Sequence, residues 1–182
     1  MSRQKAGLRL NATDFYATPP WCYENLDIGW DFKTAHEPCR GDGRIQFFLE
    51  EEKGIECTYT EITEGKDFFD WDGEVDLILT NPPFSLAKEF IDHSLPRAKV
   101  TIMLLRINYL GSISRHAWWK ENPPKALHVL SKRPSFTGKG TDATDYAWFM
   151  WGDVEPGLFF VSPPTKEQNQ FANELAQELY NT

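Results

Sequence analysis

Short apolar runs alternate with amphipathic stretches along most of the chain. Runs rich in apolar or β-branched residues predict strands over Thr34–Glu37, 55–62, Val75–Thr80, 100–107 and Ala126–Leu130. Apolar residues at helical spacing predict helices over 44–53, 85–95, 113–120 and Lys166–Tyr180. This alternation of strands and helices indicates an α/β fold with a mostly parallel sheet and helices on both faces.

The last part of the chain departs from this alternation. Two apolar runs, 146–151 and 158–161, flank the turn-like stretch 153–157, as the strands of a hairpin do. We therefore expect an antiparallel C-terminal hairpin strand, which many α/β sheets carry at an edge. Ligands of such sheets bind beyond the carboxyl ends of the strands, so candidate chemistry is sought there.

Length and composition set the class of protein. The 182 residues fit one domain, and neither a repeat nor a linker divides them, so we expect a single domain over 1–182 with a flexible arm at 1–13. No apolar run approaches the ~20 residues of a membrane span, and no signal peptide is recognisable. Three widely spaced cysteines suggest reduced thiols and a cytoplasmic protein.

Charge is distributed unevenly along the chain. The net charge of −8 argues against a nucleic-acid partner. Residues 85–140, however, hold ten Lys and Arg against three acids, a charge of +7, whereas the rest of the chain carries −15. This basic segment could form a positive face for nucleic acid or be ordinary surface charge, and composition leaves both interpretations open.

The first predicted strand ends in the sequence EPCRGDG, from Glu37 to Gly43. Gly41 and Gly43 permit a tight turn and a close approach of the backbone to a ligand. Gln46 stands where a GxGxxG motif has its third glycine, so a pyrophosphate cofactor such as NAD is disfavoured. Glu37 would repel a phosphate but could hold an ammonium group. The alternative is an ordinary turn between a strand and a helix.

Acidic residues follow the second predicted strand. Glu61 lies 18 residues after Gly43, a spacing that suits an acid binding both hydroxyls of a ribose. Asp67 and Phe68 come next and could bind the amino group of an adenine and pack on its ring. The alternative for Asp67 is a solvated acidic loop.

The third predicted strand, Val75–Thr80, ends in Asn81-Pro82-Pro83-Phe84. The Asn81 side chain offers an acceptor and two donors, and a proline has no N–H but keeps its carbonyl. Asn81 Oδ1 and the Pro82 carbonyl can therefore accept both hydrogens of a substrate amine. Phe84 offers a flat face on which a planar substrate can stack. A rigid turn followed by a core Phe is the simpler alternative.

Together these motifs resemble those of the S-adenosylmethionine-dependent N6-adenine DNA methyltransferases, most closely the small phage-type members. The resemblance covers most of the chain and implies a Rossmann-like class I methyltransferase fold. The stretch DFYATPPW (14–21) is similar to the N-terminal cofactor motif of the family, EPCRGDG to the methionine-binding motif and NPPF to the catalytic motif. The stretch RPSFTGKGTDATDYAWFMW (133–151) is similar to one common in phage members.

The resemblance assigns roles to individual residues. Tyr16 and Thr18 would flank the methionine part of S-adenosylmethionine. The implied cofactor-binding residues are Tyr16, Thr18, Glu37, Pro38, Gly41, Gly43, Glu61, Asp67, Phe68 and Asn81. The implied catalytic residues are Asn81, Pro82, Pro83 and Phe84.

The implied substrate is an adenine flipped out of DNA. No insertion large enough for a separate target-recognition domain is visible, so we expect loops within 106–145 to face the DNA. A bacterial cytoplasm, a phage or prophage origin and a role in restriction-modification fit this interpretation. No role is assigned to Asp142 or Asp145. The expected substrate-binding residues are Phe84, Arg106, Asn108, Tyr109 and Arg133.

Three alternatives to DNA adenine methylation stay open. An RNA adenine N6-methyltransferase uses identical chemistry. A protein-glutamine N5-methyltransferase shares the Asn-Pro-Pro motif, but its family has Tyr in the fourth position and an N-terminal helical domain, which we do not expect before Asp14. A catalytically silent protein of this fold could bind DNA or a host factor. No metal is expected, because ligand spacing is absent among His36, His93, His116 and His128.

Overall fold

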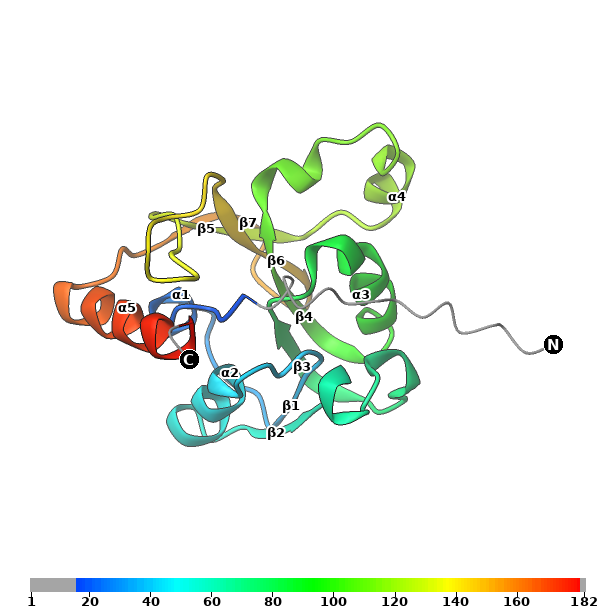
Figure 1. Ribbon diagram of the computed structural model, residues 1–182. Helices are drawn as coiled ribbons and strands as arrows, with labels where there is room; N and C mark the ends of the chain where they lie inside the picture. Colours follow the sequence, from blue (N-terminus) through cyan, green and yellow to red (C-terminus); the bar gives the residue numbers. More distant parts are fainter. Residues whose placement is uncertain (1–15, 181–182) are drawn as a thin grey trace.

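The computed structural model describes residues 16–180, so the predicted arm over 1–13 lies outside the described residues. The strands of the described part form a seven-stranded sheet in the order β2-β1-β3-β4-β6-β5-β7 (Figure 1). The predicted α/β class with a mostly parallel sheet is confirmed. The strands are β1 (Thr34–Glu37), β2 (Glu56–Tyr59), β3 (Val75–Thr80), β4 (Ala98–Arg106), β5 (Ala126–Leu130), β6 (Tyr146–Gly152) and β7 (Gly157–Val161).

Helices connect and cover these strands, close to where the apolar spacing predicted them. The helix predicted over 44–53 changes to a π-helical turn at Phe48–Glu52. The helix predicted over 85–95 begins with a 3-10 turn, Phe84–Leu86. A second 3-10 turn, Ile107–Leu110, follows β4. The α-helices are α1 (Trp21–Glu24), α2 (Arg44–Phe47), α3 (Ala87–Ser94), α4 (His116–Glu121) and α5 (Lys166–Tyr180).

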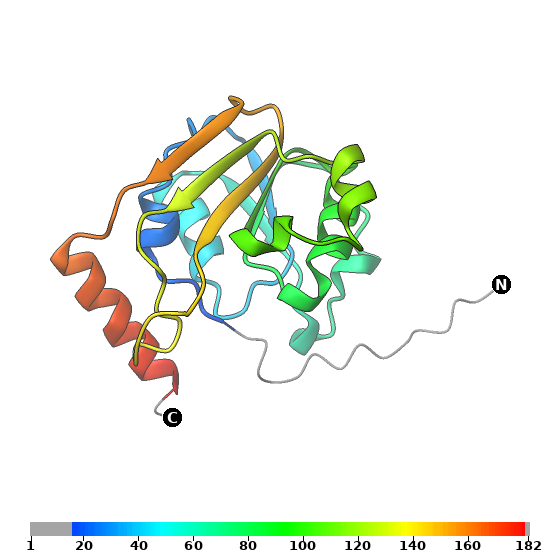
Figure 2. The same ribbon diagram turned by 90° about the horizontal axis from the view of Figure 1, so that it is seen from above.

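Two apolar cores lie on opposite faces of the sheet, because successive side chains of a strand point in opposite directions. In β3, Leu77 and Leu79 belong to one core and Ile78 to the other. Side chains of α1, α2 and α5 fill the first core, whereas α3 and α4 cover the second (Figures 1 and 2). The continuous apolar run of β3 therefore reflects burial on both faces.

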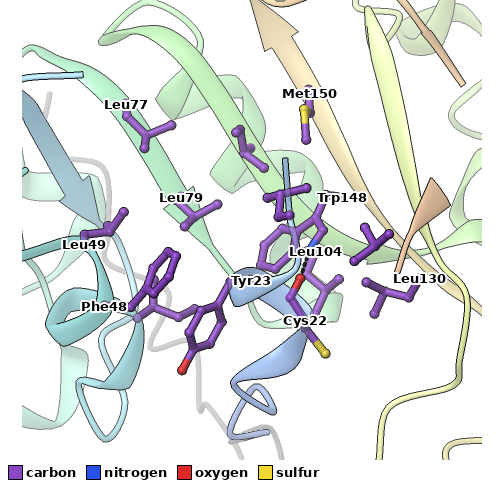
Figure 3. Packing of buried hydrophobic residues seen from close by; sticks show 14 of the residues in the cluster. Cys22, Tyr23, Phe48, Leu49, Leu77, Leu79, Leu104, Leu130, Trp148 and Met150 are labelled. Carbon is purple, nitrogen blue, oxygen red and sulfur yellow. Dashed lines mark hydrogen bonds between the residues drawn. The ribbon is translucent and has the colours of Figure 1, made fainter. Parts of the chain in front are cut away.

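The short helix α1 is anchored in the first core. Its buried residue Tyr23 lies beside Phe48 and Leu79, and its buried residue Cys22 lies near Trp148 (Figure 3). The indole Nε1 of Trp148, a fully buried residue of β6, donates a 2.8 Å hydrogen bond to the backbone oxygen of Cys22. This bond holds Cys22 against the sheet, four residues after Thr18, which together with Tyr16 is predicted to bind the cofactor.

The predicted antiparallel strand in the C-terminal part is confirmed as β6, but its expected hairpin partner, 158–161, is wrong. Strand β6 pairs antiparallel with both β4 and β5, while β7 pairs parallel with β5 at the edge of the sheet. Both edges of β6 are therefore hydrogen-bonded to other strands, and none is left for β7. The reversed strand of this mixed sheet is therefore a central one, which agrees with the burial of every residue from Tyr146 to Trp151.

Gly152 turns the chain out of β6. Its φ angle is +95°, and a Cβ atom at this position would lie 1.9 Å from the backbone oxygen of Lys99. Only glycine fits such an approach of two backbones. The N–H of Asp153 then donates to the same oxygen at 3.1 Å, and Gly157 donates to Lys125 O as the chain enters β7.

Candidate active site

The predicted site residues gather at the carboxyl edge of the sheet. Strands β1 to β4 run parallel, so the residues at their ends, including Glu37, Asn81 and Arg106, come to the same edge. Because β6 runs the other way, its first residue, Tyr146, also lies there and pairs with Arg106. The edge thus combines residues that are far apart in sequence.

The glycine turn after β1 is tied to the end of β2. Gly41 and Gly43 have positive φ angles of 56° and 81°. The N–H of Gly41 donates to Glu61 Oε2 at 2.8 Å, while Glu61 Oε1 accepts from the N–H and the hydroxyl of Thr63. Pro38, between strand and turn, accepts a 2.7 Å bond from the hydroxyl of Thr60. These hydrogen bonds fix the shape of the turn.

These hydrogen bonds limit how many further donors of a ligand the Glu61 carboxylate can accept. A carboxylate has about four acceptor positions. Three protein donors already use the Glu61 carboxylate, so about one position is left, which is short of the two that both hydroxyls of a ribose require.

Glu37 is the most unusual charge of the site. Its side chain is buried, and its one hydrogen bond among the described residues comes from the N–H of Gln46 to Oε2 at 2.9 Å. No cation of the described part forms an ion pair with it. Burial raises the pKa of this carboxyl well above its usual value. A cation at this position would lower the pKa again, so the site favours a positively charged ligand.

Asp67 and Phe68 occupy different environments. Asp67 Oδ1 caps the following 3-10 turn by accepting from the N–H of Phe69 at 3.0 Å, and its side chain stays partly exposed. Phe68 is buried in the second core, where its ring stacks with those of Phe90 (5.1 Å) and His36 (5.8 Å). The structure does not bring the Phe68 ring to an open surface, so packing on an adenine is unsupported.

The orientation of the Asn81 amide is fixed by two acceptors. Its Nδ2 donates to the backbone oxygen of Tyr16 and to the hydroxyl oxygen of Thr18, both at 3.0 Å. Because a backbone oxygen can only accept, the nitrogen must face Tyr16. The opposite atom, Oδ1, takes no hydrogen bond from the described residues and remains available as an acceptor.

The prolines that follow leave a second acceptor. The Pro83 carbonyl accepts from the N–H of Leu86 at 2.9 Å and so begins the turn into α3. The Asn81 backbone oxygen accepts from the Cys39 thiol at 3.3 Å. The Pro82 carbonyl takes no hydrogen bond from the described residues. Asn81 Oδ1 and Pro82 O are therefore two neighbouring acceptors at the end of β3.

Phe84 lies among aromatic rings from distant parts of the chain. Its ring centre is 5.8 Å from that of Tyr16 and 5.7 Å from that of Tyr146. Phe136 contacts both tyrosines, with ring centres 5.4 Å away in each case. The guanidinium of Arg106 lies 4.8 Å from the Phe84 ring centre. These contacts hold Phe84 as part of an aromatic wall rather than as a free surface ring.

Arg106 is itself held in place by a polar network. Its Nε donates to the Tyr146 hydroxyl at 3.1 Å, and that hydroxyl donates to Asp142 Oδ2 at 2.7 Å. Asp142 also forms an ion pair with Arg106 at 3.6 Å. Asp145 pairs instead with Arg133, at 2.7 Å. Asp142 thus has a positioning role that its sequence context did not reveal. Arg133 lies in the same connection between β5 and β6, where Asp145 holds it.

A pocket of about 380 Å³ lies beside this network. Four of the five predicted substrate-binding residues line it, and Arg133 does not. The pocket is lined by Phe84, Ser85, Leu105, Arg106, Asn108, Tyr109 and Arg115.

The sheet divides the basic segment into two parts. Lys99 and Lys125 lie at the amino ends of β4 and β5, away from the candidate site. The pocket, by contrast, is lined by Arg106, the last residue of β4, and by Arg115. Arg133 follows the carboxyl end of β5. Only part of the +7 charge of this segment is therefore placed to act at the site.

Sequence reasoning missed several residues of this edge. Tyr146 was overlooked because 146–151 was taken for a hairpin strand at the edge of the sheet, whereas Phe136 lies in the predicted loop range 106–145 but was not singled out. An apolar run of that length indicates a central strand, and a reversed central strand brings its first residue to the carboxyl edge. Arg115 lies within the loops at 106–145 that were expected to face the DNA, but it was not singled out as a site residue, and the structure places it in the lining of the pocket.

The remaining candidate groups provide no nucleophile. Burial raises the pKa of the thiols of Cys22, Cys39 and Cys57, so each stays protonated near neutral pH. Among residues 16–180, no group of three or more His, Cys, Asp and Glu is placed to hold a metal ion. None of the described helices is long and apolar enough to cross a membrane.

Comparisons with known proteins support the fold. No protein-family model matches the sequence, and no curated protein matches it either. Among solved structures, the methyltransferase subunit of the type I restriction-modification system of Streptococcus thermophilus is similar, with a TM-score of 0.51, 12% identity and 86% of this chain covered. A modification subunit assigned to a type I restriction enzyme of Vibrio vulnificus is also similar, with a TM-score of 0.52, 14% identity and 94% of this chain covered.

The chain spans about half the length of these structures, 49% and 54% respectively. Its described residues therefore share the fold of methyltransferase subunits, at an identity that establishes the fold alone.

Proposed function

We propose that this protein transfers a methyl group from S-adenosylmethionine to the N6 amino group of adenine in DNA. The observation that carries the proposal is the orientation of Asn81. Its amide nitrogen donates to Tyr16 and Thr18, and among the described residues neither Oδ1 nor the adjacent carbonyl of Pro82 accepts a hydrogen bond. Two neighbouring acceptors match the two hydrogens of an exocyclic amine.

The other residues of the edge suit the cofactor. S-adenosylmethionine, when bound, supplies an activated methyl group on a positively charged sulfonium. The buried carboxyl group of Glu37, which forms no ion pair within residues 16–180, fits its ammonium group, and the turn of Gly41 and Gly43 permits a close approach of the ligand. Glu61 can accept one ribose hydroxyl, and Asp67 is exposed enough to accept from an adenine amine.

The chain's own residues contribute mainly by positioning. Asn81 Oδ1 and Pro82 O would hold both amine hydrogens, which favours a pyramidal nitrogen and directs its lone pair. Phe84, supported by Tyr16 and Tyr146, would stack on the base. Such fixed orientation of reacting groups can lower a barrier by ~7–11 kcal/mol. No covalent bond to the protein is required.

The pocket beside Phe84 is suited to an extruded base. An adenine inside a duplex cannot reach Asn81, so it must leave the stack. Arg106, Asn108 and Tyr109 line the pocket, where they could contact the base and adjacent phosphates. Arg133 would join them if its ion pair with Asp145 opens towards a phosphate.

Methyl transfer from labelled S-adenosylmethionine to unmethylated DNA tests this function. We expect label on adenine N6 with the wild-type protein and its loss with Asn81→Ala. Asn122→Ala is the matched control, because Asn122 also donates its amide to a backbone oxygen but lies at the end of α4.

Three other results would change the conclusion. Cofactor binding without label on DNA would direct the search to RNA and then to protein acceptors. Equal activity of Asn81→Ala and wild type would contradict the role of Asn81. Absence of cofactor binding, measured by calorimetry, would support a silent protein of this fold.

A further inference from the structure

The loop that follows the pocket residue Tyr109 is closed at its base. The guanidinium of Arg115 lies 3.9 Å from the centre of the Tyr109 ring, and its Nε and Nη2 donate to the Tyr109 backbone oxygen at 3.2 and 3.0 Å. Trp119 of α4 donates to the same oxygen at 3.4 Å. Both Tyr109 and Arg115 line the pocket, so residues 110–114 rise from its rim.

The tip of this loop presents Ile113, whose side chain is 99% exposed. It is the most exposed large apolar side chain of the described part. The loop has local order, since His116 N–H donates to Ile113 O at 3.3 Å and the hydroxyls of Ser112 and Ser114 are 2.9 Å apart. The segment between β4 and α4 lies at the upper edge of the view in Figure 1.

Exposure alone means little, because single apolar side chains are common on protein surfaces. The position of Ile113 distinguishes it. Arg106, which is paired with Asp142, and Arg115 line the pocket at the base of this loop, and His116 and Lys120 are exposed residues of the following helix α4. An apolar tip among basic side chains, next to a pocket for a planar group, suits the groove of a nucleic acid better than a protein partner.

We propose that Ile113 enters the base stack of duplex DNA when the target adenine moves into the pocket. This inference rests on the proposed function. Removing a base from the stack costs a few kcal/mol and leaves a gap between its neighbours. An apolar side chain that fills the gap offsets part of this cost, as wedge residues of DNA-bending proteins do. The Tyr109–Arg115 clamp keeps the wedge beside the pocket.

The test compares Ile113→Ala with the wild-type protein on synthetic duplexes. The duplexes contain a methylated site, mapped by sequencing the product of the first assay, with the target adenine either correctly paired or opposite a mismatched base. A mismatched adenine leaves the stack more easily and needs less help from a wedge. Leu158→Ala on the edge strand β7 is the matched control, since Leu158 is 60% exposed.

We expect Ile113→Ala to lose about tenfold in kcat/KM on the paired duplex, which corresponds to about 1.4 kcal/mol of transition-state stabilisation, and to recover most of this loss on the mismatched one. Leu158→Ala should behave as wild type on both duplexes. Ile113→Phe, which keeps a large apolar tip, should retain activity on the paired duplex. Unchanged circular dichroism spectra would confirm that the fold is intact.

The possible failures are distinguishable. Wild-type activity of Ile113→Ala on the paired duplex would overturn the wedge. An equal loss on both duplexes would also overturn it, because the defect would then not concern base extrusion. Absence of methylation by the wild-type protein on either duplex would instead overturn the proposed function, and the wedge with it.

Discussion

Replacing Glu37 with Gln should make the protein more stable and a poorer binder of its cofactor. The Glu37 side chain is 2% exposed and accepts a single hydrogen bond, from Gln46 N–H. Gln can still accept this bond through its carbonyl oxygen but cannot ionise. The substitution therefore removes the charge from the buried position and leaves the local packing almost unchanged.

The sign of the stability effect follows from the pKa. Burial raises the pKa of Glu37 in the folded protein, so as pH rises the unfolded chain releases this proton first. Above the usual carboxyl pKa, the wild-type protein should lose stability relative to Glu37→Gln by about 1.4 kcal/mol per pH unit, until the folded-state pKa is reached. At pH values below the usual carboxyl pKa, the two proteins should be almost equally stable.

Cofactor binding should change in the opposite direction. A hydrogen bond to a charged partner contributes about 1.5–3 kcal/mol, so losing the carboxylate should weaken binding of S-adenosylmethionine about 10- to 150-fold. The wild-type affinity should also increase as pH rises, because the ionised carboxylate is the form that binds an ammonium group. The affinity of Glu37→Gln should lack this part of the pH dependence.

Two measurements test these statements. Urea unfolding followed by circular dichroism, from pH 4 to pH 8, gives the stability difference, and calorimetry gives the affinity. Glu56→Gln, at an exposed position of β2, is the control and should change neither quantity. A stability difference that is the same at pH 5 and pH 8 would refute the buried-carboxylate argument. Unchanged affinity would refute the contact with the ammonium group.

Three further predictions concern the framework of the site. Burial lowers the pKa of His36 to about 4, so between pH 6.5 and 4 the wild-type protein should lose up to about 3 kcal/mol of stability relative to His36→Gln, measured by urea unfolding. Trp148→Phe removes the donor to Cys22 O and should cost at least about 1–3 kcal/mol; a smaller loss would mean that this bond does not anchor α1. Gly152→Ala should cost more than about 1 kcal/mol in the same assay, because its Cβ would collide with Lys99 O, and an unaffected midpoint would contradict this.

Much of the framework was readable from local patterns. The runs Thr34–Glu37, Val75–Thr80 and Ala126–Leu130 were predicted with the bounds that the structure shows. Of the three, Val75–Thr80 contains the continuous apolar run that is typical of a strand buried on both faces. The Asn-Pro-Pro-Phe motif was located correctly at the end of β3. The role of its residues in catalysis stays a prediction.

The differences from the predictions have one cause: the sequence of a strand or an aromatic residue does not specify which distant segment it will pack or pair with. The run 158–161 was assigned to the nearest strand in sequence, yet β6 was already paired on both sides. Phe68 was expected to pack on an adenine ring; its ring is buried against Phe90 among the described residues, and its contact with a ligand stays a prediction. In both cases competition for partners in three dimensions decided the outcome.

Local spacing and the chemistry of single residues were enough to predict most strands and helices and the two acceptors at Asn81 and Pro82. Which acceptors stay without a partner among the described residues depends on tertiary contacts. Glu61 is largely used by Gly41 and Thr63, whereas the Asn81 amide is turned by Tyr16 so that Oδ1 is open. The physical reason is that a hydrogen-bonding group is available to a ligand only after the fold has satisfied its own donors and acceptors.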